Sequence, residues 1–364
     1  MFKNYIKLYN QLCKIKFFFN LPEKKKILLY DDTNLWVLKK ITNEKFNILK
    51  TREEKEIYFW ILIKQIIFFD FKFTTYCKNY IKFTTPKIVI TFIDTNIDFY
   101  QLKNSFVNTN FISIQNGTRT PDWFESHAMK KAKNLSCDHI FVFNKFLKFK
   151  YSNYINSKIH IIGNYKNNMV NISETRNYNQ FLIISEFEKD DKKKIIFQKK
   201  LLYLINLYIC NSNIKINILL KSKNDLNQKK EIEFYKKIFK SNCSFIKSLE
   251  WNQSYKIIDK FENIIFMYST LGYEAISRKK KIAVFSPDRI KGFNYYFGWP
   301  ANSRIAYNFF STKKVTYNEI KRVLNNVINC SQANWQNAHY TVIKDQMYLD
   351  KNNSKLKKVL LRLI

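Results

Sequence analysis

Residues 263–285 read NIIFMYSTLGYEAISRKKKIAVF, and this stretch decides the fold. An apolar run ends in Ser269-Thr270-Leu271-Gly272, a stretch of helical character follows, and a second apolar run closes the segment at residues 281–285. This order predicts a strand, a turn, a helix and a second strand, which together form a βαβ unit. A helix that begins at such a turn presents unpaired backbone N–H groups and the positive end of its dipole.

Two interpretations of this turn follow from its residues. Ser269 and Thr270 are good helix N-caps, and a cap needs no ligand. A helix N-terminus with hydroxyl groups also suits a phosphate, and in the context of the whole chain we predict a nucleotide-phosphate site made by Ser269, Thr270 and Gly272. Glu274 follows in the first helical turn and is predicted to bind ribose hydroxyls, the alternative being favourable placement in the helix dipole.

Length and composition limit the classes of protein to consider. The chain has 364 residues, enough for two domains, and 46% of them are hydrophobic. Only 5 Gly and 5 Pro argue against a disordered or turn-rich all-β protein. The 63 Lys and Arg outnumber the 29 Asp and Glu, which gives a net charge of +34. This charge predicts an anionic partner such as an anionic membrane surface, or it reflects a lysine-rich composition throughout.

Cysteine spacing and hydropathy bear on metals and on location. The 6 cysteines are scattered without a CxxC pair, so no zinc site, other metal site or disulfide framework is expected. The first 21 residues lack an uninterrupted apolar core, and we expect no signal peptide. The apolar window at residues 58–69 predicts a buried helix or, alternatively, a helix on a membrane surface. We therefore expect a cytoplasmic protein, either free or peripheral at the inner face of the cytoplasmic membrane.

Strands alternate with helices along both halves of the chain. Strands are predicted at residues 26–30, 46–49, 87–93, 110–115, 139–143, 158–162, 181–185, 215–220, 244–247, 263–268 and 281–285. Helices are predicted at residues 53–69, 99–105, 192–210, 229–239, 254–260 and 270–278, with further helices after residue 317. Alternation of this kind indicates parallel sheets covered by helices. We predict an α/β fold with two Rossmann-like domains, residues 1–170 and 178–364, separated by a polar, Asn-rich segment.

Polar residues follow three predicted strands of the first domain. Asp31 and Asp32 come after one strand, Asp94 after the next, and Gln115-Asn116-Gly117-Thr118-Arg119 after the third. Ligands of parallel sheets bind beyond the carboxyl ends of the strands. Each group alone is also ordinary turn chemistry, but three in one domain predict a site.

Roles for these residues follow from their chemistry. Any one of the three aspartates is predicted as the general base toward an acceptor hydroxyl. Arg119 is predicted to hold an anionic acceptor or phosphate. An aromatic loop at residues 293–300 either stacks a base or shapes the acceptor cleft, or it plugs the space between the domains. The predicted acceptor or cleft residues are Gln115, Asn116, Gly117, Arg119 and Trp299.

Several familiar motifs do not occur in the sequence. It has no DxD, which disfavours a nucleotide-sugar site bridged by a metal ion. It has no GxGxxG and no GxxxxGK[ST], which disfavours a dinucleotide enzyme and a P-loop kinase. It has no GxSxG, so a hydrolase nucleophile elbow is not supported.

Five segments, in chain order, resemble a known family. They are residues 114–119 (IQNGTR), 163–168 (GNYKNN), 269–275 (STLGYEA), 297–300 (FGWP) and 345–348 (DQMY). With these segments the chain resembles bacterial O-antigen and surface-carbohydrate biosynthesis proteins, which are similar to glycosyltransferases of the GT-B type. Thr118 replaces an expected aliphatic residue and Asn164 an expected serine. The resemblance implies two domains facing a cleft, with an activated sugar held mainly by the C-terminal domain and an acceptor by the N-terminal one.

The predicted function is a glycosyltransferase of surface-polysaccharide assembly. It moves a sugar from a nucleotide-sugar donor to a glycan or lipid-linked acceptor, with no metal ion and no cofactor beyond that substrate. The charge of the leaving group falls on the helix N-terminus and on Arg278 or Lys221. Three alternatives are a polyol-phosphate transferase on the same fold, a non-catalytic scaffold, and a basic nucleic-acid-binding protein. The last lacks recognition motifs, so no specific nucleic acid is expected.

Overall fold

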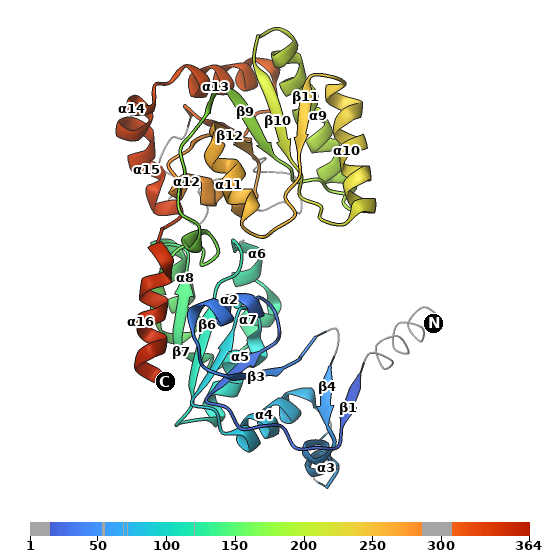
Figure 1. The fold of residues 1–364 in the computed structure, drawn as a ribbon, viewed down its shortest axis with the longest axis vertical. Helices are drawn as coiled ribbons and strands as arrows, with labels where there is room; N and C mark the ends of the chain where they lie inside the picture. Colours follow the sequence, from blue (N-terminus) through green and yellow to red (C-terminus); the bar gives the residue numbers. More distant parts are fainter. Residues whose placement is uncertain (1–14, 53–54, 68, 71, 120, 286–307) are drawn as a thin grey trace.

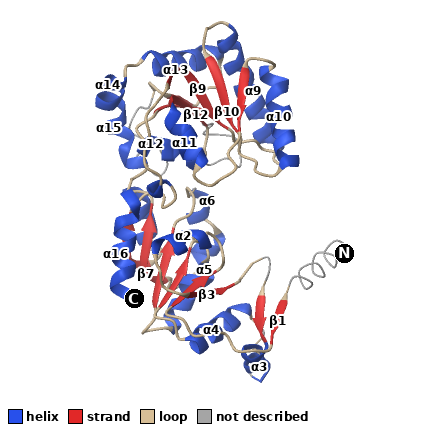
Figure 2. Ribbon diagram, viewed as in Figure 1, coloured by secondary structure: helices blue, strands red, loops and turns tan. Residues whose placement is uncertain are grey.

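The chain folds into two lobes, each built on a parallel β-sheet. The computed structural model describes residues 15–52, 55–67, 69–70, 72–119, 121–285 and 308–364. The N-terminal lobe lies below the second lobe in Figure 1, and each has a six-stranded sheet. Helices pack on the sheets (Figure 2), so the predicted α/β fold with two Rossmann-like units is confirmed.

The first sheet has the order β3-β2-β5-β6-β7-β8, and every neighbouring pair is parallel. Successive side chains of a strand point to opposite faces. Ile27 and Leu29 therefore pack with α2 and α16, and Leu28 and Tyr30 lie in the cluster that includes α4, α5 and α8. The elements of this lobe are β2 (Ile27–Tyr30), α2 (Leu35–Ile41), β3 (Phe46–Leu49), α4 (Phe73–Thr84), β5 (Ile88–Thr91), α5 (Ile97–Leu102), η1 (Lys103–Ser105), β6 (Asn110–Ile114), α6 (Pro121–Phe124), α7 (His127–Lys131), β7 (Ser136–Val142), α8 (Lys145–Ser152), β8 (Asn156–Ile161) and α16 (Ser354–Leu363).

The second sheet has the order β11-β10-β9-β12-β13-β14, again all parallel. Its chain path runs outward from β9 to β11 and then resumes at β12 on the other side of β9, so the strand order reverses between β9 and β12. In open parallel sheets ligands bind at such a reversal. The elements are β9 (Asn177–Ile184), α9 (Lys192–Cys210), β10 (Lys215–Leu219), α10 (Asp225–Phe239), β11 (Cys243–Ile246), α11 (Gln253–Lys260), β12 (Phe261–Phe266), α12 (Thr270–Ser277), β13 (Lys281–Phe285), β14 (Ser311–Thr312), α13 (Tyr317–Asn329), α14 (Gln332–Asn334), η3 (Trp335–Tyr340), α15 (Thr341–Ile343) and η4 (Lys344–Gln346).

One predicted helix is partly wrong. Within residues 53–69, Glu56–Tyr58 forms strand β4, which pairs in parallel with β1 (Lys16–Phe18), and α3 (Phe59–Ile67) begins only after it. The local sequence has helical character, but pairing with a strand about forty residues earlier in the chain overrides it at these positions. Within the described residues, no helix combines the length and apolar character that crossing a membrane requires.

The chain crosses between the lobes twice. The first crossing follows β8 and contains η2 (Asn167–Met169); the second leads to η5 (Lys351–Asn353) and α16. Gly163 and Leu349 form an antiparallel bridge between the two crossings. Gly163 has φ +74°, and a Cβ atom there would lie 1.8 Å from the Tyr348 carbonyl oxygen, so only glycine fits. Although α16 follows the second lobe in sequence, it packs on the first sheet. The domain limits 1–170 and 178–364 stay a prediction.

Two asparagines of the GNYKNN segment (residues 163–168) connect the first crossing to the second lobe and to the second crossing. The Asn167 side chain donates to Ser277 Oγ at 2.7 Å, at the end of α12. The Asn168 side chain donates to the Asn353 side chain at 2.9 Å and accepts from the Asp350 N–H at 3.0 Å. Asn167 and Asn168 are buried. This segment therefore fastens the first crossing to the second lobe on one side and to the second crossing on the other.

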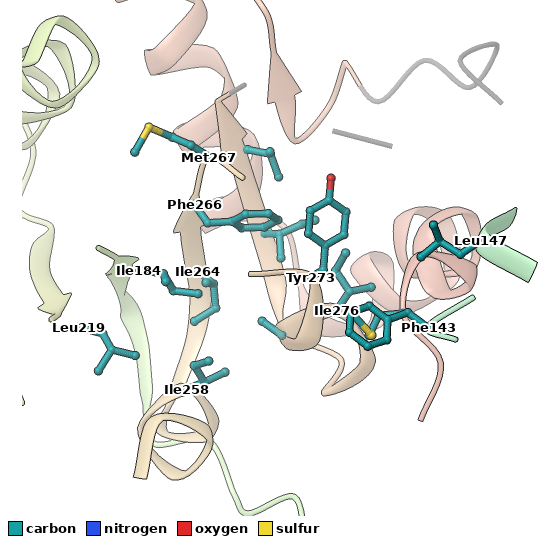
Figure 3. Close-up of a cluster of buried hydrophobic side chains, with 14 of the residues drawn as sticks. Phe143, Leu147, Ile184, Leu219, Ile258, Ile264, Phe266, Met267, Tyr273 and Ile276 are labelled. Atoms are coloured by element: carbon teal, nitrogen blue, oxygen red, sulfur yellow. The ribbon is translucent and has the colours of Figure 1, made fainter. Parts of the chain in front are cut away.

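The hydrophobic core is continuous from one lobe to the other. Figure 3 shows Ile184 of β9 and Ile264 of β12 packed together, with Phe266 beside Tyr273 of α12. Phe143, which follows β7 of the first lobe, lies next to Ile276 of α12. Helix α12 is thus packed on its own sheet and on the other lobe at the same time.

Gly272 is the residue that lets α12 approach β12 closely. A Cβ atom at position 272 would lie 2.2 Å from the Phe266 ring, which is buried and packs against Tyr273. We expect Gly272→Ala to lower the free energy of unfolding by about 1–3 kcal/mol, measured by urea denaturation, because the core is overpacked. Gly117→Ala is the matched control, since its Cβ would meet atoms no closer than 3.7 Å. Equal stability of the two variants would contradict this account.

Candidate functional site

A cavity of about 490 Å³ lies at the carboxyl ends of strands β9, β10 and β12. The second lobe contributes most of its wall, and the first lobe contributes Asn116, Asn164 and Lys166. The cavity sits where the strand order of the second sheet reverses, the position at which parallel sheets bind ligands. Two segments far apart in sequence therefore share one site between the lobes.

The N-terminus of α12 opens into this cavity. Ser269 is the N-cap, and its Oγ accepts the Leu271 N–H at 3.2 Å. Thr270 Oγ1 accepts the Thr118 N–H at 3.2 Å, a contact between the lobes. Ser269 and Thr270 both line the cavity, as does the predicted ribose ligand Glu274. The structure thus brings three of the four predicted donor-site residues to one place.

The fourth, Gly272, serves the packing of α12. Its N–H donates to the Ser269 carbonyl at 3.0 Å, and its Cα faces the Phe266 ring. It does not belong to the cavity wall. The predicted phosphate contact through this N–H has to be corrected, because the group is already bonded within the first helical turn.

Glu186 holds the loop that leads into α12. It follows β9, and its carboxylate accepts the backbone N–H groups of Met267, Tyr268 and Ser269 at 2.8–2.9 Å. Burial raises its pKa to about 7, although these three N–H groups and Lys221 act in the opposite direction. The sequence prediction missed Glu186, for which the only signal was a polar pair, Ser185-Glu186, at a strand end.

Glu274 is a second buried carboxyl group in the cavity wall. The Asn164 side chain donates a hydrogen bond to its Oε1. Its buried Oε2 has no hydrogen-bond partner in the described part of the chain. Burial raises the pKa of Glu274 to about 7, while Tyr255 and Lys166 act in the opposite direction. A buried oxygen without a hydrogen-bond partner, on a residue of the cavity wall, fits a ligand hydroxyl that donates to it.

Lysines and an aromatic pair complete the site. Lys166, Lys221 and Lys223 line the cavity, so cations come from both lobes. Burial lowers the pKa of Lys166, although Glu274 acts to raise it.

Trp251 also lines the cavity, and its ring lies 4.2 Å from that of Trp36 in the other lobe. Of the two predicted charge-stabilising cations, Lys221 is in the cavity wall.

Arg278, the other predicted cation, binds protein groups and does not line the cavity. Its guanidinium donates to both carboxylate oxygens of Asp259 and to the Asn167 side chain. It also donates to the carbonyl oxygens of Val170 and Asn171, which lie in the first crossing. All five guanidinium N–H groups are therefore used, and the side chain is fully buried. The prediction that Arg278 stabilises a leaving group is wrong for this arrangement.

In the first lobe, Asp94 and Arg119 bind each other. Both oxygens of the fully buried Asp94 carboxylate accept from the Arg119 guanidinium, and one also accepts from Tyr151. Burial alone would lower the Arg119 pKa, but the Asp94 charge raises it. This pairing leaves neither charge directed at a ligand, so the predicted roles as base and as acceptor-binding cation need correction.

The other predicted first-lobe residues divide into buried and accessible groups. Asp31 is buried, with Oδ1 accepting Thr33 Oγ1 at 2.6 Å, whereas Asp32 is exposed. Burial and Asp31 raise the pKa of Asp32. Neither aspartate belongs to the cavity wall. Gln115 is buried and bonded to the Gly117 carbonyl at 2.8 Å.

Asn116 is the predicted cleft residue that reaches the cavity. Its Oδ1 accepts from the Asn34 side chain at 3.2 Å and from the Tyr165 hydroxyl at 2.6 Å. The loop that carries Asp31 and Asp32 is thereby held next to a residue of the cavity wall. The remaining predicted residue, Trp299, and its aromatic loop lie outside the described residues.

Comparison with known proteins gives one family and a common fold. The model of a family described as "putative O-antigen biosynthesis protein" matches residues 112–364. No curated protein matches the sequence.

Three solved structures are similar over most of their length. The S. aureus MnaA–UDP co-structure has a TM-score of 0.58 at 16% identity, covering 93% of this chain and 98% of that chain. UDP-GlcNAc 2-epimerase from Neisseria meningitidis bound to UDP-GlcNAc has a TM-score of 0.52 at 14% identity, covering 92% and 99%. The H444N variant of the wall teichoic acid polymerase TagF has a TM-score of 0.53 at 12% identity, covering 98% and 90%. These identities establish a shared fold.

Proposed function

The chain belongs to the O-antigen biosynthesis protein family, and from that premise we propose that it is a nucleotide-sugar-dependent glycosyltransferase of surface-glycan assembly. The observation that carries this proposal is the cavity at the strand reversal of the second sheet. A helix N-terminus, three lysines and the buried carboxyl group of Glu274 line it, and one oxygen of that group has no hydrogen-bond partner in the described part of the chain. That set offers positive groups for a diphosphate and an acceptor for a sugar hydroxyl.

The donor would bind in a defined orientation. Its phosphates would lie at the N-terminus of α12, near the Ser269 and Thr270 hydroxyls, with Lys221 and Lys223 neutralising their charge. A ribose hydroxyl would donate to Glu274 Oε2. Uridine diphosphate is the first nucleotide to test, because two proteins of the same fold were solved with UDP or UDP-GlcNAc. In such a site the same groups would stabilise the departing diphosphate.

The acceptor would approach from the first lobe. Of the three predicted aspartates, Asp32 alone has an exposed side chain, and its loop contacts the cavity residue Asn116 through Asn34. We assign it the role of general base toward the acceptor hydroxyl. An acceptor-dependent assay of Asp32→Asn, with nucleotide affinity measured alongside, tests this role.

Nucleotide binding is the first consequence of the proposed site. The double variant Ser269→Ala with Thr270→Ala is expected to weaken UDP binding roughly 10- to 100-fold, as for the loss of hydrogen bonds to a charged group. Isothermal titration calorimetry measures the affinity. Ser126→Ala is the control, because Ser126 also caps a helix, α7, but lies outside the cavity wall. Unchanged UDP affinity in a folded double variant would rule out this phosphate site.

Product analysis separates the proposed reaction from its alternatives. Sugar transfer gives a glycoside and a free nucleoside diphosphate. Polyol-phosphate transfer, the alternative on the same fold, gives a phosphodiester, and ³¹P NMR distinguishes the two. Nucleotide binding without any turnover would favour the scaffold alternative instead.

A further inference from the structure

Large apolar side chains are exposed together at one end of the first lobe. Phe17, Phe19, Trp60, Ile67 and Phe69 have 54%, 70%, 53%, 64% and 84% of their surface accessible. They belong to β1 and α3 or directly follow them, and we name this surface the β1–α3 face. In Figure 1, α3 lies at the lower end of the molecule, away from the second lobe. Exposed apolar surface of this kind marks an interaction site.

Local contacts hold these side chains on one surface. Strand β1 pairs in parallel with β4, and α3 continues directly from β4. The Trp60 indole N–H donates to the Phe19 carbonyl at 2.6 Å, and the Phe19 and Phe59 rings lie 5.4 Å apart. The β1–α3 face is therefore a built surface and not a set of scattered residues.

Helix α3 is apolar nearly all round but packs on one side only. Ile61 and Gln65 are its buried residues, and the Gln65 amide donates to the Asp70 and Lys72 carbonyls at 3.0 and 2.9 Å. Trp60, Lys64 and Ile67 are exposed and share another side of the helix. A helix with this composition is normally buried on all sides, so the exposed side lacks its partner.

The charges around the β1–α3 face identify the partner. Lys16, Lys24, Lys64 and Lys72 are exposed around it. The nearby acidic side chains already have partners. Glu56 forms an ion pair with Lys50, and Glu23 forms one with Lys25. Asp70 accepts hydrogen bonds from the Thr75 hydroxyl and from the Lys72 backbone N–H. The chain as a whole carries +34. Aromatic and aliphatic tips surrounded by ammonium groups match the interface of an anionic bilayer, where acyl chains lie beneath phosphate headgroups.

We propose that the β1–α3 face docks the protein onto an anionic phospholipid bilayer. Helix α3 has 9 residues, too few to cross, so it would lie along the interface with Trp60 and Ile67 inserted and Lys64 at the headgroups. This inference does not depend on the reaction proposed above. It would bring the first lobe, the predicted acceptor side, next to the membrane.

Vesicle co-sedimentation tests the docking surface. The full chain is mixed with vesicles of phosphatidylcholine alone, or with about 30% phosphatidylglycerol added. The expected result is binding to the anionic vesicles that weakens, but does not vanish, as salt is raised. The variant Phe19→Ser/Trp60→Ser/Ile67→Ser is expected to bind them at least about tenfold more weakly, because it loses the apolar contribution.

The matched control places three serines on the second lobe. Tyr203→Ser/Leu226→Ser/Leu249→Ser removes side chains of comparable exposure, 56%, 64% and 69%, and is expected to bind vesicles like the natural protein. Circular dichroism and urea denaturation confirm that each variant is folded. Equal vesicle binding by the two triple variants, or no binding by the natural protein, overturns the proposal. So does a dimer, seen by light scattering, that the first variant alone abolishes, since the partner would then be a second copy.

Discussion

Arg278→Met is expected to lower the free energy of unfolding by about 3–5 kcal/mol, the loss typical of removing one member of a buried ion pair. The substitution leaves the fully buried Asp259 carboxylate without its cation. It also removes the donors to Asn167, Val170 and Asn171, which fix the first crossing onto the second lobe. Stability and the placement of the lobes depend on the same side chain.

Urea denaturation followed by circular dichroism measures this loss. Arg322→Met is the matched control, because Arg322 forms a surface pair with Glu319 in which both side chains are about one-third exposed. Surface pairs contribute at most about 1 kcal/mol. If Arg278→Met destabilised the protein no more than Arg322→Met, the buried ion pair would not hold the crossing as described.

Glu274→Gln is expected to change how stability depends on pH. Burial raises the Glu274 pKa from 4.5 to about 7. Between these values the folded protein holds a proton that the unfolded chain releases, so stability falls as pH rises through this window. The full shift corresponds to about 3 kcal/mol. Glutamine keeps an acceptor for Asn164 but never ionises, so the variant should gain about 3 kcal/mol over the natural protein near pH 8 and little near pH 4.

Comparing the free energy of unfolding of the two proteins at two pH values isolates the contribution of the Glu274 carboxyl group. Glu186 and His160 also have pKa values shifted by burial, but they are present in both proteins, and their contributions cancel. Glu233→Gln, at an exposed position of α10, is the control for removing a negative charge. If the free energies of unfolding of the natural protein and of Glu274→Gln differ by the same amount from about pH 4 to about pH 8, the raised pKa of Glu274 is contradicted.

The sequence predicted the sheets well because their signals are local. Apolar runs bounded by polar turns identified β3 (Phe46–Leu49) and β13 (Lys281–Phe285) with their observed limits. The N-cap Ser269 marked the start of α12. Strand β4 was predicted as helix, since its pairing with β1 is a contact between distant segments that no local pattern encodes.

The candidate site was predictable only in part. Ser269, Thr270 and Glu274 follow a strand end and stand out in the sequence, but Asn164 and Lys166 of the first lobe reach the cavity only through the placement of the lobes. Asp94 and Arg119 resembled ligand-binding residues because strand-end charges look alike whether they face a ligand or each other. Their pairing with each other depends on the tertiary structure, which the local sequence does not reveal.

The two crossings of the chain determine how the lobes are able to move. Since Gly163 and Leu349 are bridged, the two connections lie side by side, and a rigid rotation of one lobe over the other would have its hinge at this pair. Asn164 and Lys166 of the cavity wall lie directly beside this hinge. Any opening of the lobes would therefore reposition the Asn164 contact with Glu274, coupling domain closure to the state of the binding site.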